Sequence, residues 1–136
     1  MLRMKSGGTF ASVMQMQLER AVQSAEAEMV ASAQELIITA EPDVPIDTGA
    51  LRSSGGTEGP TRKGDSTSVD VFFGDDNVYN PDHGRPTSFY AQDQHENMNY
   101  THPRGGKDHY LTDNLAKMRS AITDRIKRAV IKGFTR

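Results

Sequence analysis

A long run of helical spacing near the N-terminus constrains the fold of this chain more than any other feature. No glycine or proline occurs from Thr9 to Glu41, and Thr9 is a suitable helix N-cap. Pro42 then ends the run, because the residue before a proline is pushed out of the helical region. We predict one amphipathic helix over residues 9–41, after a flexible N-terminus at residues 1–8. Its apolar residues are spaced by three or four positions: Phe10, Val13, Met14, Leu18, Val22, Ala25, Met29, Ala33 and Leu36.

The C-terminal part of the chain has the same apolar spacing. It predicts a second amphipathic helix over residues 109–132, with Gly133 as a natural stop. The apolar positions are Leu111, Leu115, Met118, Ile122, Ile126, Ala129 and Val130.

The middle of the chain, residues 42–108, contains all six prolines and nine of the twelve glycines, which favours turns and short strands over helix. Alternation predicts a strand over Ser68–Phe73, with one buried face. The other predicted segments are a strand from Phe89 toward His95, a third strand over Leu51–Glu58, a hairpin loop over Gly59–Ser66 and a surface loop over Gly74–Thr87.

These elements predict an α+β fold, in which a long N-terminal helix and a C-terminal helix pack with a small antiparallel β-sheet. The length of 136 residues suits a single domain, 1–136. Only 35% of the residues are hydrophobic and tryptophan is absent, so we expect a marginally stable subunit that partners complete. Cysteine is absent, which fits assembly in a reducing host cytoplasm and excludes disulfides and cysteine zinc sites. We expect no membrane span and no signal peptide.

Charge is divided between the two predicted helices. Residues 16–43 contain six acids and one base, whereas residues 111–136 contain seven bases and two acids. We favour the interpretation that the acidic first helix meets the basic last helix, in the same subunit or in a neighbour. Non-specific contact with DNA phosphates is the second interpretation, and a solvated helix face is the third. The candidate contact residues are Lys117, Arg119, Arg125, Lys127, Arg128 and Lys132.

The residues of the segment Val44–Ser54 favour a sharp turn of the backbone. Pro45 restricts φ, Asp47 or Thr48 can cap a short turn, and Gly49 permits tight backbone. Leu51 and Arg52 follow directly. From the residues alone, we interpret this segment as a structural turn that leads from the helix to the sheet.

This segment resembles the "VPxDTGxLRxS" signature of phage minor capsid and head–tail joining proteins. Two later pieces resemble the same family: the "YAxxxHE" pattern and the "HP-G" loop, followed by the "KYL" start of the last helix. The matches cover about half of the chain, from Val44 to Leu111, in the expected order. Their residues in the later pieces are Tyr90, His95, Glu96, His102, Pro103, Tyr110 and Leu111.

The resemblance implies a structural virion protein at the neck, assembled as a homo-oligomeric ring between the portal or adaptor protein and the tail terminator or tail tube. Such a ring would help to retain or channel DNA. Because the sequence contains no correctly spaced catalytic residues, we also expect that the chain is not an enzyme and needs no cofactor. An assembly factor that never enters the particle would share the same motifs.

A different class of function is a small metal-dependent hydrolase or nuclease that uses His95, Glu96 and His102. Their spacing is not the i, i+4 helical pair of metalloproteases. We therefore interpret these histidines as structural. No glycine-rich run has the spacing of a P-loop or of a dinucleotide site, and no serine lies in a nucleophile elbow.

Overall fold

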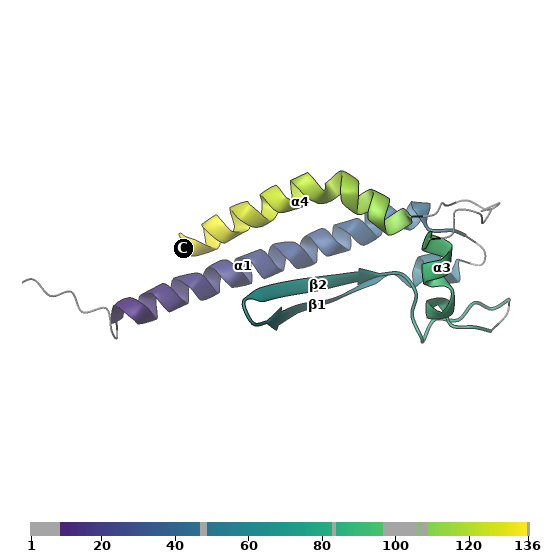
Figure 1. The fold of residues 1–136 in the computed structure, drawn as a ribbon, viewed down its shortest axis with the longest axis horizontal. Coiled ribbons are helices and arrows are strands. Elements are labelled where there is room, and N and C mark those ends of the chain that lie inside the picture. Colours follow the sequence, from purple (N-terminus) through teal and green to yellow (C-terminus); the bar gives the residue numbers. More distant parts are fainter. Residues whose placement is uncertain (1–8, 47–48, 83, 97–105, 107–108, 136) are drawn as a thin grey trace, which may run out of the picture.

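Helix α1 (Thr9–Ala40) is the axis of the molecule, and the other long elements pack along two of its sides (Figure 1). The computed structural model describes residues 9–46, 49–82, 84–96, 106 and 109–135. Helix α4 (Tyr110–Phe134) lies on one side of α1, and the hairpin of strands β1 (Gly56–Lys63) and β2 (Ser66–Phe72) lies on the other (Figure 1). The α+β class and both long helices are therefore confirmed. The predicted flexible N-terminus, residues 1–8, lies outside the described residues.

The two long helices run antiparallel. At the start of α4, Asn114 Nδ2 donates to Asp43 Oδ2 at 2.9 Å, just past the end of α1. At the end of α4, Gly133 lies against the backbone of Arg20 and Ala21. The prediction of Gly133 as a stop was wrong, because α4 continues to Phe134. A Cβ at Gly133 would lie 2.6 Å from the carbonyl oxygen of Arg20, so glycine here allows the helices to approach closely.

Strands β1 and β2 form a two-stranded antiparallel sheet. The prediction of a loop over Gly59–Ser66 was wrong for most of that segment. Strand β1 extends to Lys63, which pairs with Ser66, so Gly64 and Asp65 alone make the turn. Thr67, Val69 and Val71 are half-buried while Ser66, Ser68 and Asp70 are exposed, as the alternation of a strand with one covered face requires.

Two predicted strands are wholly or partly helical. The third predicted strand, Leu51–Glu58, was right only for Gly56–Glu58, which form the start of β1. Leu51, in the predicted third strand, lies in the short helix α2 (Ala50–Ser53), which begins after Gly49 in a left-handed conformation at φ 85°. The segment from Phe89 toward His95 consists of the end of a 3-10 helix (Thr87–Phe89) and helix α3 (Ala91–Glu96). Helix brings Ala91 and His95 onto one face, where both are buried near Tyr110. Tertiary packing thus overrides the local strand propensity.

The buried apolar cluster lies at the end of the molecule where α1 ends and α4 begins. Its residues come from five parts of the chain, so it joins the termini of both helices, the end of β2, α2 and α3: Ala40, Val44, Leu51, Phe73, Ala91 and Tyr110. Away from this end, the buried residues of α1 are Ala21, Glu26, Ser32, Ala33 and Leu36. None of the helices in the described part of the chain has the length and apolar character needed to cross a membrane.

Candidate functional site

The Val44–Ser54 motif acts as a clamp at the end of α1. Arg52 Nη2 donates to the carbonyl oxygens of Pro42 and Val44, each at 2.8 Å, and Arg52 Nε reaches the Val44 oxygen at 3.3 Å. Val44 and Leu51 are buried in the apolar cluster, and Pro45 is buried beside them. Asp47 and Thr48 lie outside the described residues. The described part of the motif therefore joins the end of α1 to α2 through hydrogen bonds and apolar packing.

The second part of the motif brings two histidines and a glutamate together. His95 Nδ1 lies 2.8 Å from Glu96 Oε1, and His109 Nε2 lies 3.4 Å from Glu96 Oε2. His95 Nε2 faces the Thr112 amide nitrogen at 3.5 Å, so both ring nitrogens of His95 have partners within the chain. The His95 ring also packs edge-on against Tyr110, with centroids 4.8 Å apart. These contacts fix α3 onto the start of α4.

His102, the third residue of the metal-site hypothesis, and Pro103 lie outside the described residues. Within the described ranges, no group of three or more histidine or acidic side chains is placed to hold a metal ion. A pocket of about 350 Å³ beside His95 is lined mainly by apolar side chains, Phe73, Ala91 and Tyr110 among them. In the described part of the chain, His95 therefore serves packing and hydrogen bonding.

Tyr90 and Leu111 are both half-buried against the apolar cluster, next to Ala91 and Tyr110. Tyr110 itself is almost fully buried, and its hydroxyl donates to the carbonyl oxygen of Ala91 at 3.1 Å. Burial, assisted by the nearby Glu96 carboxylate and Tyr90, raises the pKa of Tyr110 to about 12. All the described motif residues of this part thus support one junction between α3, α4 and the hairpin.

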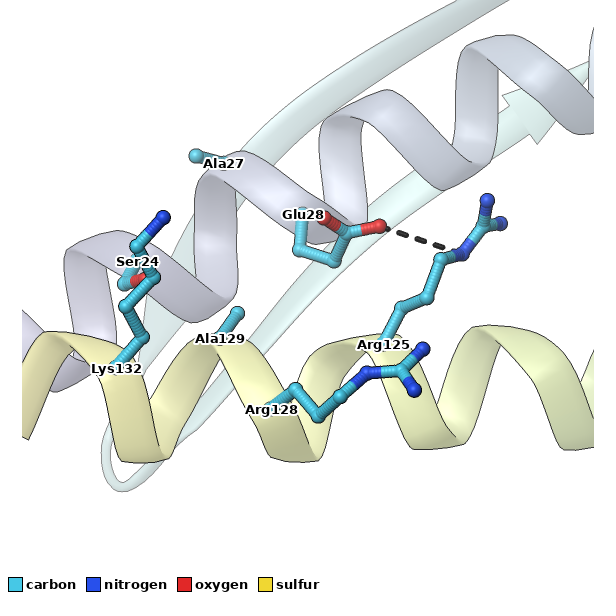
Figure 2. A pocket seen from close by; sticks show the side chains of 7 residues that line it. All are labelled: Ser24, Ala27, Glu28, Arg125, Arg128, Ala129 and Lys132. Carbon is cyan, nitrogen blue, oxygen red and sulfur yellow. Dashed lines mark ion pairs between the residues drawn. The ribbon is translucent and has the colours of Figure 1, made fainter.

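A groove between α1 and α4 is lined by three basic side chains of α4 (Figure 2). We call it the basic groove; its volume is about 370 Å³. Figure 2 shows the three basic side chains on α4: Arg125 points to Glu28 of α1, Lys132 extends toward Ser24, and Arg128 lies along α4. The remaining lining residues are small: Ser24, Ala27 and Ala129.

One cation of the groove already pairs with the acidic helix. Arg125 Nη1 donates to Glu35 Oε2 at 2.6 Å, and Arg125 Nε lies 3.4 Å from Glu28 Oε1. The meeting of the acidic first helix with the basic last helix thus occurs within the chain, through Arg125. The Nε atom of Arg125 is buried and has no hydrogen-bond partner within the described residues.

The other basic candidates remain outside such pairs. In the part of the chain that the structure describes, none of them makes an ion pair, and all are exposed: Lys117, Arg119, Lys127, Arg128 and Lys132. The positive charge of α4 is therefore only partly neutralised by the acidic residues of the described part of the same subunit.

An ion-pair cluster that sequence analysis missed holds the hairpin on α1. Arg62 of β1 donates to both carboxylate oxygens of Glu26, at 2.7 and 2.8 Å, and to Glu19 at 2.9 and 3.1 Å. Thr67 Oγ1 of β2 adds a hydrogen bond to Glu26 at 3.2 Å. The hydrogen bonds from Arg62 hold the pKa values of Glu19 and Glu26 below their ordinary value, despite the opposing effect of desolvation. The sequence signal for this cluster was the spacing of Glu19 and Glu26, which are seven residues apart and therefore lie on one face of the helix.

We expect acid to weaken the attachment of the hairpin. Because the folded pKa of Glu26 lies below its unfolded value, its contribution to stability is complete above the unfolded pKa. That contribution is lost as the pH falls through the folded pKa, so the free energy of unfolding should decrease as the pH falls below about 4.5, the ordinary pKa of glutamate. Glu26→Gln should flatten this dependence, as measured by urea unfolding across the pH series. The matched control is Glu41→Gln on the exposed 3-10 turn (Glu41–Asp43), and an equal flattening there would contradict the expectation.

No protein-family model matches the chain, and neither a curated protein nor a solved structure matches it.

Proposed function

We propose that this chain is a structural subunit of the neck of a tailed phage, which assembles as a homo-oligomeric ring between the portal or adaptor protein and the tail. The resemblance of the motifs from Val44 to Leu111 to those of head–tail joining proteins is the reason for proposing a phage neck. The geometry supports the more general part of the proposal, that the function resides in contacts between subunits. The basic residues of α4 are available for such contacts or for non-specific contact with the DNA that passes the neck.

The observation that carries the proposal is the uncovered apolar end of α1. Because Gly133 lies beside Arg20, the eleven residues of α1 before Arg20 extend past the packed part of α4, over a length of about 16 Å (Figure 1). No charged residue occurs in Thr9–Leu18. The side chains of Phe10 and Leu18 are 59% and 57% exposed, and Val13, Met14 and Met16 are exposed as well.

An apolar helix end of this kind is typical of an interaction surface. Phe10 and Val13 lie within one turn of each other, so they form a local patch instead of scattered exposed residues. At the nearby end of α4, Val130, Ile131 and Phe134 are also exposed. A subunit whose core is confined to one end, and whose other end exposes apolar side chains, is expected to be completed by a neighbour.

Two measurements test this proposal. Mass measurement and negative-stain electron microscopy of the purified full-length chain should give a closed ring of several copies. Phe10→Ser together with Val13→Ser should shift the protein toward the monomer while leaving its circular dichroism spectrum unchanged. The matched control is Ser12→Ala on the same exposed segment.

The location in the particle needs a separate experiment. Mass spectrometry of purified virions, with gold labelling of this chain, should place it at the neck. A strictly monomeric protein that is absent from the particle would overturn the proposal. A protein that forms rings but is absent from finished particles would point to an assembly factor.

A further inference from the structure

The basic groove has more positive charge than its own chain neutralises. Arg128 and Lys132 lie three and seven residues after Arg125, so all three side chains rise from one side of α4 (Figure 2). The single carboxylate of the groove, Glu28, lies 3.4 Å from Arg125 Nε, a distance and geometry that leave this buried donor without a hydrogen bond. A carboxylate supplied from outside the groove would pair with the two exposed cations, Arg128 and Lys132.

The outer face of the hairpin has the opposite imbalance. Glu58 of β1 is the direct cross-strand partner of Asp70 of β2, and both are exposed. We call them the acidic pair. Neither carboxylate makes an ion pair within the described residues. Directly opposed like charges destabilise a sheet, so this arrangement is unfavourable in an isolated subunit.

The acidic pair faces away from α1. Arg62 and its cross-strand partner Thr67 both reach Glu26 on α1, which identifies the inner face of the hairpin. Because side chains alternate along a strand, Asp70 lies on the opposite face from Thr67, and Glu58 lies with Asp70.

The basic groove lies on another side of α1 from the hairpin. Glu26 points to the hairpin, whereas Ser24 and Glu28, two residues before and after it, line the groove. A displacement of two residues turns a helical side chain by about 200°. The two surfaces therefore cannot meet within one subunit, and each is available to another copy.

We propose that the acidic pair of one copy docks into the basic groove of a second copy, with its carboxylates facing Arg125, Arg128 and Lys132. This inference rests on the proposed function, because it names one contact of the ring, in addition to the apolar end of α1. The two surfaces differ and lie on separate sides of α1, so the contact is heterologous, and heterologous contacts generate rings when the rotation closes. Charge complementarity between the two faces selects a second copy as the occupant and sets the register of docking.

Charge reversal of each surface gives the test. The groove variant is Arg128→Glu with Lys132→Glu, and the hairpin variant is Glu58→Lys with Asp70→Lys. The matched control is Ala116→Glu with Ser120→Glu, which also adds acidic side chains at exposed positions of α4 outside the groove. The full-length proteins are compared by analytical ultracentrifugation over a concentration series, after circular dichroism has established equal helix content.

Each single-surface variant should raise the concentration for half-assembly at least about tenfold, because opposed like charges across an interface cost several kcal/mol. The control should assemble as the unmodified chain does. An equimolar mixture of the groove and hairpin variants should assemble again, because each reversed groove then meets a reversed hairpin. The same recovery is expected when all four reversals are combined in one chain.

The outcomes distinguish a failure of this contact from a failure of ring formation. If the unmodified chain forms rings and both variants do so at the same concentration, the contact is wrong and the ring remains. If the groove variant assembles normally but loses binding to a short DNA duplex, the groove binds phosphates and the contact is again wrong. If the unmodified chain is monomeric at every concentration, the proposed function fails and this contact fails with it.

Discussion

Replacing Tyr110 with alanine should lower the free energy of unfolding by about 3–5 kcal/mol, the range for truncating a large buried aromatic residue. Tyr110 is 1% exposed and lies at the centre of the apolar cluster. Its ring packs edge-on against Phe73, with centroids 5.6 Å apart, and against His95 at 4.8 Å. Because this cluster joins α3, α4 and the hairpin, its loss would weaken all three attachments together. Urea unfolding followed by circular dichroism, at fixed protein concentration, measures the change.

Two variants distinguish the ring of Tyr110 from its hydroxyl. Tyr110→Phe keeps the packing and loses the hydrogen bond to Ala91, so it should cost only about 1 kcal/mol. It should also remove a tyrosine that ionises near pH 12, in place of the ordinary value near 10, from the ultraviolet titration. Tyr79→Ala is the matched exposed control, with a change within about 0.5 kcal/mol. A similar loss for Tyr79→Ala and Tyr110→Ala would contradict the assignment of the core.

Replacing Arg52 with alanine is expected to cost about 1.5–3 kcal/mol, the range for hydrogen bonds that involve a charged group. The variant would leave the carbonyl oxygen of Val44, a fully buried residue, without its guanidinium donor. The carbonyl oxygen of Pro42 would lose its donor as well, although water can replace it there. The expected result is a looser junction between α1 and α2, measured by urea unfolding and by faster amide exchange in α2.

Arg52→Lys tests whether the planar fork of the guanidinium is required. A single ammonium cannot reproduce bonds from Nε and Nη2 to two carbonyl groups, so lysine should recover only part of the stability. Arg119→Ala, at an exposed position of α4, is the matched control and should stay within about 0.5 kcal/mol. Full stability of Arg52→Lys would show that the planar fork of the guanidinium is not required at this position.

Local sequence patterns were sufficient to predict the elements that bury one regular apolar face. The apolar spacing of Thr9–Ala40 and of the C-terminal segment reports burial along one helix stripe, and the structure contains both helices close to the predicted bounds. The alternation in β2 was equally informative. The sequence patterns did not identify the helices at Leu51 and at Phe89–His95. A short apolar run fits a strand or a helix, and the packing partner decides which of the two forms.

The candidate site shows the same division. From sequence alone, the acidic and basic ends of the chain were evident, and so was the turn around Gly49 and Arg52, because composition and backbone restrictions are local properties. Only the tertiary structure decided which ion pairs form. Arg62 pairs with Glu19 and Glu26, and Arg125 pairs with Glu28 and Glu35. The other cations of α4 are exposed. These pairs join residues 36 to 97 positions apart, and their geometry depends on how α1, α4 and the hairpin pack. Helical or strand spacing carries no information on contacts at that separation.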